Sequence, residues 1–191
     1  WKYDTVPQKG LNGRIGYQPR GRGLGGSSAI NAMVYIRGHR WDYDNWAAMG
    51  CTGWSYDDVL PVFKRCEDNV RGANPFHGAG GPLSVNDQHW PQPGSLAFIE
   101  AAAEMQFPRN ADFNGATQDG FGLYQVTQKN GERWTSARAY VEPARHRMEV
   151  ITGALNEKII VENGRAAGVV IRQSWGRKRT IKARGAVVLS A

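Results

Sequence analysis

The feature that most constrains this chain is a glycine-rich run at residues 21–28, Gly-Arg-Gly-Leu-Gly-Gly-Ser-Ser. The glycines at positions 21, 23 and 26 have the G-x-G-x-x-G spacing of dinucleotide-binding turns, but that fingerprint requires an apolar strand directly before it. Residues 16–20 are polar and include a proline, so the run does not open a nicotinamide-type Rossmann domain. Two interpretations remain: a turn without a ligand, and a loop whose backbone N–H groups hold a phosphate.

The neighbouring side chains suit a phosphate-binding loop. Ser27 and Ser28 supply hydroxyl groups and are helix N-cap residues by type, so we expect a helix over residues 29–36. A helix N-terminus favours negative charge, and Arg20 and Arg22 add electrostatic attraction to an anion. A simple glycine turn before a helix has the same residues, so the pattern alone leaves both interpretations open.

The rest of the chain shows helical patterns first and β patterns afterwards. Residues 1–20 and 109–134 are rich in loop formers. We expect residues 1–20 to be extended or loop, and residues 109–134 to be irregular. Helices are expected where apolar residues recur at helical spacing after a capping residue, and strands where short apolar runs stand between turns. The expected helices are 41–46, 55–67, 95–106 and 135–141, and the expected strands are 83–85, 150–152, 158–161, 167–171, 179–183 and 186–189.

Two turn sequences organise the last part of the chain. Asn163-Gly164 is a two-residue hairpin turn by type, and residues 174–176 form a second turn. Residues 158–183 are therefore predicted to form a three-stranded β-meander. Residues 186–189 are apolar throughout, as in a strand that is covered on both faces. Because the sequence stops directly after this run, we expect an internal piece of a longer protein.

Composition excludes several classes of protein. The chain has 191 residues, and no stretch approaches the roughly 18 consecutive apolar residues of a membrane span. Its net charge of +7 permits an anionic partner, but the basic residues at 177–184 lie along the predicted meander, where charge discourages edge pairing. We therefore expect no nucleic-acid partner. No group of His, Cys and carboxylates has metal-ligand spacing, and Cys51 and Cys66 are expected to be buried thiols.

The glycine-rich run, together with its continuation through Asn31 to Gly38, resembles the first signature of the glucose–methanol–choline (GMC) family of flavin oxidoreductases. Residues 31–39 and 124–131 are most similar to the alcohol dehydrogenase and choline dehydrogenase branches of that family. Further segments with the same resemblance are 42–46, 53–56, 76–78, 80–83, 112–115, 120–122 and 135–140. Together these segments cover nearly the whole chain.

This resemblance implies an α+β chain, part of an FAD/NAD(P)-binding α/β domain together with a GMC substrate-binding domain. Residues 1–40 are expected to be the FAD-contacting loop and helix of the flavin domain. Residues 41–145 are expected to be mostly substrate-domain helices and loops. Residues 146–191 are expected to return to the flavin domain as strands and the meander.

The resemblance also implies a set of cofactor-binding residues. Some family members attach FAD covalently through a His just before the Asn of the motif, and here that position is Ile30, so FAD is expected to bind non-covalently. The strand after Thr152-Gly153 resembles the family segment whose backbone binds the adenine, and Asn156 is the residue expected to act there. Residues expected to contact the pyrophosphate or the isoalloxazine are Gly26, Ser27, Asn31, Ala32 and Val34.

The implied activity is the oxidation of a primary alcohol, aliphatic or choline-like, to the aldehyde, with hydride transfer to the flavin. The catalytic His of the family is expected downstream of Ala191, and His39, His77, His89 and His146 do not match its position. The chain is therefore expected to contain no catalytic residue and to be inactive by itself.

The flavin is expected to pass its electrons to oxygen, a quinone or another carrier, and the expected location is the cytoplasm or the periphery of the inner membrane. The alternative is a catalytically inert, independently folded binding fragment of the substrate domain. Flavin absorbance of the purified sample would distinguish the two hypotheses.

Overall fold

The computed structural model describes residues 1–190 of the chain. They form two compact units, Trp1–Ala144 and Arg145–Ala191. The first unit contains as many acidic as basic residues, fourteen of each, whereas the second has ten basic residues and three acidic ones. The net charge of +7 therefore belongs to the second unit. The domain boundaries expected at residues 40 and 145 stay predictions.

Three helices of the first unit confirm the predicted pattern: α1 (Arg40–Ala48), α2 (Tyr56–Cys66) and α3 (Pro93–Glu104). The first two begin with reciprocal capping boxes. At α2, the Ser55 hydroxyl accepts from the Asp58 N–H, and the Asp58 carboxylate accepts from the Ser55 N–H. Such caps satisfy N–H groups that a helix leaves unpaired in its first turn, which fixes where α2 starts.

Short strands join distant parts of the first unit. The strand β4 (Glu67–Asn69) pairs with β5 (Leu83–Val85) in parallel, and β3 (Val34–Tyr35) pairs with β6 (Gln125–Val126) in the antiparallel sense. Asn86, just after β5, exchanges two backbone hydrogen bonds with Val126 of β6, at 2.9 and 2.8 Å. The strands are β3 (Val34–Tyr35), β4 (Glu67–Asn69), β5 (Leu83–Val85), β6 (Gln125–Val126), β7 (Gln128–Lys129) and β8 (Glu132–Arg133). Strand β5 confirms a prediction, and β6 to β8 lie in a region expected to be irregular.

The helix predicted over residues 29–36 is wrong. The chain makes one 3-10 turn at Gly26–Ala29 and then extends into β3. Two long-range bonds explain the difference: the Thr127 N–H donates to the Met33 carbonyl at 2.8 Å, and Val34 pairs with Val126. These partners lie more than 90 positions away, so a local capping signal could not reveal them.

At the start of the first unit, in a segment expected to be extended or loop, strands β1 (Lys2–Asp4) and β2 (Tyr17–Pro19) form an antiparallel hairpin. The last helix of this unit differs from prediction. A π-helix at Ala137–Val141 continues into α4 (Glu142–Ala144), so Pro143 does not end the helix at 141 as expected. The proline lies where the helix changes from π to α geometry. A 3-10 turn, Arg145–Arg147, follows in the second unit.

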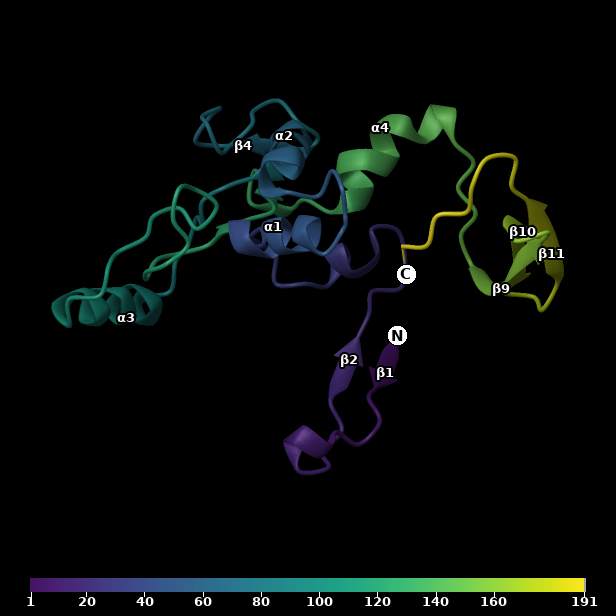
Figure 1. Ribbon diagram of the computed structural model, residues 1–191, viewed down its shortest axis with the longest axis horizontal. Helices are drawn as coiled ribbons and strands as arrows, with labels where there is room; N and C mark the ends of the chain where they lie inside the picture. The colour runs from purple at the N-terminus through teal and green to yellow at the C-terminus, as the bar shows by residue number, and fades with distance from the viewer. Residues whose placement is uncertain (191) are drawn as a thin grey trace. The chain divides into compact units, whose positions relative to one another are not determined.

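The second unit is the predicted meander (Figure 1). Its strands are β9 (Ala154–Glu162), β10 (Arg165–Gln173) and β11 (Lys178–Lys182), with β10 in the centre. Asn163 and Gly164 both have positive φ, at 50° and 73°, as a type I′ hairpin turn requires.

Two further predicted strands are wrong: residues 150–152 and 186–189 are not strands, and Val188 is 85% exposed. An apolar run becomes a strand only where a neighbouring strand accepts its hydrogen bonds, and none of the described strands pairs with either run. The cysteines differ as well, since Cys51 is exposed and Cys66 is half-buried. No helix within residues 1–190 combines the length and apolar character that crossing a membrane requires.

Candidate functional site

The glycine-rich loop folds back on itself. A Cβ atom on Gly21 would lie 2.0 Å from the carbonyl oxygen of Gly26, so only glycine fits at position 21. The Gly21 N–H donates to the Ser27 hydroxyl oxygen at 3.1 Å. Gly26 has a φ of +52°, and the space that its Cβ would enter is open. The loop thus brings its two ends into contact and leaves open space beside Gly26.

Asn31 forms the turn that follows. Its side-chain oxygen accepts from the Met33 N–H at 3.1 Å and from Nη1 of Arg133 at 2.8 Å. Met33 has a φ of +63°, which is uncommon for a residue with a long side chain. Within residues 1–190 the amide nitrogen of Asn31 has no hydrogen-bond partner, so it is a donor available to a ligand.

A pocket of about 590 Å³ lies beside this turn and contains two predicted cofactor residues, Ala32 and Val34. Trp90, at its edge, is 90% exposed. The other lining residues are Met33, Gln88, His89, Val126, Gln128, Asn130 and Gly131. The structure therefore combines the end of the glycine-rich loop with three segments that motif reasoning did not assign to the site.

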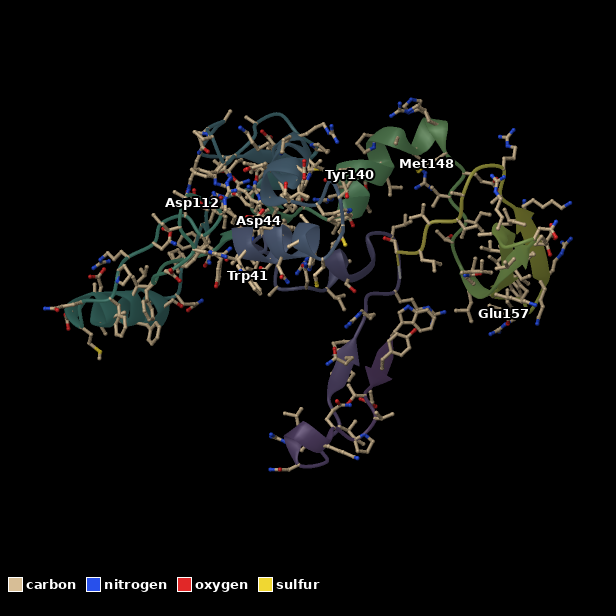
Figure 2. All side chains as sticks on the ribbon, in the orientation of Figure 1. Trp41, Asp44, Asp112, Tyr140, Met148 and Glu157 are labelled. Atoms are coloured by element: carbon tan, nitrogen blue, oxygen red, sulfur yellow. The ribbon has the colours of Figure 1, made fainter. Side chains whose placement is uncertain are left out.

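Beneath β3 lies a buried cluster of charged residues that the sequence did not reveal. Glu67 and His77 are completely buried and Arg37 nearly so. Glu67 Oε1 lies 2.8 Å from Nη2 of Arg37 and 3.0 Å from Nδ1 of His77, and it accepts from the Gly78 N–H at 2.8 Å. Nε2 of His77 lies 2.9 Å from Oδ2 of Asp112, which comes from the loop after α3 (Figure 2).

The ionisation of this cluster follows from its contacts. Burial disfavours the charged form of Glu67, but hydrogen bonds from His77 and Gly78 and the charge of Arg37 outweigh it and hold the pKa of Glu67 below its usual range. The hydrogen bond to Glu67, reinforced by Asp112, raises the pKa of His77 despite burial. Burial raises the pKa of Tyr35 in β3 to about 12. Ionised Glu67 and Asp112 thus flank His77 on both ring nitrogens and favour its protonated form.

The cluster supports the pocket through its neighbours. The main-chain N–H of Arg37 donates to the Asn114 side-chain oxygen at 2.8 Å, and the Asn114 amide donates to the Tyr35 carbonyl at 3.1 Å. On the other side, Asn69 and Gln125 exchange two side-chain hydrogen bonds, at 2.9 and 3.2 Å. These bonds hold β3 and β6, whose residues line the pocket. Polar residues at the inward positions of β4, Glu67 and Asn69, were the signal that could have indicated such a cluster.

Asn156, the predicted adenine residue, lies on β9 in the second unit. It stands at an irregularity of the β9–β10 pairing, where Val170 faces Lys158 and Ile171 faces Asn156. With the side-chain amide oriented to satisfy its neighbours, its nitrogen lies 3.2 Å from the carbonyl oxygens of Lys158 and Val170. Its role toward adenine stays a prediction.

The remaining histidines have identifiable positions. His39 caps α1 by accepting from the Trp41 N–H at 3.1 Å, His89 lines the pocket, and His146 is exposed in the second unit. The main-chain N–H of His77 donates to the Asn74 side-chain oxygen at 2.8 Å, so Asn74 holds the turn before His77. Within residues 1–190 no cluster of His, Cys, Asp and Glu could hold a metal ion.

Comparisons with known proteins agree with this geometry. Residues 6–191 match the family described as GMC oxidoreductase, and the chain belongs to that family. It is 44% identical over its whole length to oxygen-dependent choline dehydrogenases of Rhizobium etli and Rhizobium meliloti, and covers 35% of each. The chain thus spans about a third of the length of these curated relatives.

Two solved structures have a similar fold. The pyridoxine 4-oxidase of Mesorbium loti is 32% identical, with a TM-score of 0.88 over 95% of this chain and 36% of that one. An FAD-dependent oxidoreductase from Chaetomium thermophilum is 27% identical, with a TM-score of 0.84 over 95% of this chain and 34% of that one. The family therefore implies a flavin cofactor, and the α+β fold class is confirmed.

The residues present fit a flavin. The open space beside Gly26 admits close approach of a phosphate to the backbone. The unpartnered amide nitrogen of Asn31 offers a hydrogen bond, and the pocket beside Ala32 and Val34 has room for a ring system. Gly26, Asn31, Ala32 and Val34 thus lie where a flavin could reach them, and the contacts of all six predicted residues with FAD stay predictions.

Proposed function

We propose that the protein carrying this chain is an FAD-dependent oxidoreductase that converts a primary alcohol to an aldehyde, with choline-like alcohols as its substrate class. The pocket beside the Asn31 turn, in a GMC chain 44% identical to choline dehydrogenases, is the observation that carries the proposal. Non-covalent FAD is part of it, because Ile30 has no group that could attach the cofactor.

In this proposal the chain supplies one wall of the flavin site. Bound FAD supplies the acceptor for the hydride that leaves the alcohol carbon. The glycine-rich loop holds the pyrophosphate through backbone N–H groups, the amide nitrogen of Asn31 orients the cofactor, and Ala32 and Val34 exclude water from the ring face. The base that takes the alcohol proton is expected outside residues 1–191.

Electrons are proposed to leave the reduced cofactor to oxygen, a quinone or another carrier, in the cytoplasm or at the periphery of the inner membrane. Oxygen is favoured by the names of the relatives, which are called oxygen-dependent. Choline is favoured over other alcohols on the same ground.

The test is spectroscopic. The intact protein is purified, and its visible absorbance is recorded before and after anaerobic addition of choline, ethanol and benzyl alcohol. We expect the purified protein to show flavin absorbance. Choline should bleach this absorbance, and ethanol and benzyl alcohol should bleach it more slowly. A colourless protein that takes up no added FAD would contradict the proposal and favour an inert binding fragment.

A further inference from the structure

An arginine that is not among the predicted cofactor residues contacts the proposed cofactor site. We infer that Arg133 is a positioning residue that fixes Asn31 for cofactor binding, an inference that rests on the proposed function. Nη1 of Arg133 donates to both the main-chain and the side-chain oxygen of Asn31, each at 2.8 Å, and lies 3.1 Å from the Ser28 carbonyl oxygen. One guanidinium nitrogen therefore holds both ends of the turn that leads into the pocket.

The charge of Arg133 is directed at this turn. All three acceptors are neutral carbonyl or amide oxygens, and among the described residues no carboxylate pairs with Arg133. The neighbouring Glu132 pairs with Arg138 instead, at 2.6 Å. Hydrogen bonds from an ionised donor are stronger than neutral ones, so Arg133 restrains the turn more firmly than a neutral donor could.

The contact also decides which atom of Asn31 can reach a ligand. Its side-chain oxygen is occupied by Arg133 and by the Met33 N–H. With that oxygen fixed, the amide nitrogen is the polar group of the side chain left for the cofactor. Arg133 thereby selects one of the two orientations of the amide, and the selected one presents a donor.

Arg133 itself is held by a rigid framework. It lies on β8, where it pairs with Gln128 of β7. The indole of the next residue, Trp134, donates to the carbonyl of Pro82, the residue before β5, at 2.9 Å. Two residues after Trp134, the Ser136 hydroxyl donates to the Gly25 carbonyl at 3.1 Å. The segment 133–136 thus contacts the glycine-rich loop at two separate places.

The experiment is a double-mutant cycle in the intact protein with Arg133→Gln, Asn31→Ala and the combined variant. The dissociation constant of FAD is measured on the apoprotein by flavin fluorescence. Each single change is expected to weaken FAD binding about tenfold, as the loss of one hydrogen bond to the cofactor does. The combined variant is expected to bind no more than two- to threefold more weakly than Asn31→Ala, because Arg133 acts through Asn31.

Two further variants separate positioning from general damage. Arg138→Gln breaks the ion pair with Glu132 and a 3.4 Å hydrogen bond to the Arg133 carbonyl, but it keeps the Arg133 guanidinium, so FAD affinity is expected to stay unchanged. Arg133→Lys keeps the charge and is expected to recover part of the affinity. Hydrogen exchange of the Met33 amide in the apoprotein is expected to accelerate in Arg133→Gln and not in Arg138→Gln, a readout that needs no flavin.

The outcomes distinguish this inference from the proposed function. A wild-type protein that binds FAD, with an Arg133→Gln variant that binds equally well, overturns the inference alone. Additive losses in the cycle also overturn it, since they show that Arg133 acts independently of Asn31. A wild-type protein that binds no FAD overturns the proposed function, and the inference with it.

Discussion

The carboxylate of Glu67 and the imidazole of His77 form a completely buried pair, with Oε1 and Nδ1 3.0 Å apart. The pair joins the parallel strands β4 and β5 to the loop that carries Asp112, and Arg37 completes it from the segment after β3. A buried charged cluster therefore lies next to the strand β3, whose Val34 lines the pocket.

The stability of the protein should depend on pH through His77. Folding raises the pKa of His77, so the folded state binds the proton more tightly than the unfolded state does. The protonated His77 therefore stabilises the fold fully at a pH below its ordinary pKa of 6.5, and this stabilisation is lost as pH rises through the pKa of the folded state. Folding lowers the pKa of Glu67, so its ionised form stabilises the fold fully at a pH above its ordinary pKa of 4.5. This stabilisation is lost as pH falls through the pKa of Glu67 in the folded state. We expect both contributions to be present between about pH 4.5 and 6.5.

The measurement is thermal unfolding between pH 5 and 9 for wild type, His77→Gln and His146→Gln. The wild type and the exposed-site control His146→Gln should lose stability in parallel as pH rises above 6.5. His77→Gln should be less stable at pH 6 and show a flatter dependence. Equal slopes for all three proteins would show that His77 does not titrate as described.

Removing the charge of Glu67 should destabilise the fold strongly. In Glu67→Gln the guanidinium of Arg37 remains buried without its counter-ion, and breaking a buried ion pair costs about 3–5 kcal/mol. Urea unfolding gives the free energy of unfolding. Glu100→Gln breaks an exposed pair with Arg109 and is the matched control, expected to change the midpoint little. Similar midpoints for the two variants would contradict a structural role for the cluster.

The contact between Gly21 and Gly26 should be necessary for flavin binding. In Gly21→Ala the new methyl group meets the Gly26 carbonyl, so the loop must open, and we expect FAD affinity to fall at least tenfold. Gly10→Ala is the control, since its Cβ meets nothing within 4 Å and its φ is not positive. Fluorescence titration of both apoproteins with FAD compares them. Unchanged affinity in Gly21→Ala would exclude the loop from the site.

FAD should leave the protein on denaturation. Ile30 stands where some family members carry the attaching His, and a hydrocarbon side chain cannot form that bond. Acid precipitation followed by absorbance of the supernatant at flavin wavelengths should recover all of the cofactor. Flavin that stays with the precipitated polypeptide would show attachment at another residue, which peptide mapping would locate.

The sequence by itself determined the family and the elements with local causes. The capping box of Ser55 and Asp58 starts α2, and the Asn163-Gly164 pair turns the meander, because in both cases the bonds or dihedral angles involved lie within a few residues. The motif from Gly21 to Gly38 indicated a flavin enzyme, and Ala32 and Val34 do line a pocket.

Only the tertiary structure decided what surrounds those elements. The expected helix over residues 29–36 gives way to β3 because Val34 finds a partner in Val126, and the apolar run 186–189 pairs with none of the described strands. The cluster at Glu67 and the contact of Arg133 with Asn31 join residues 10 to 102 positions apart. Charged side chains at such separations give no periodic signal, because their burial is set by which segments meet and not by their neighbours in sequence.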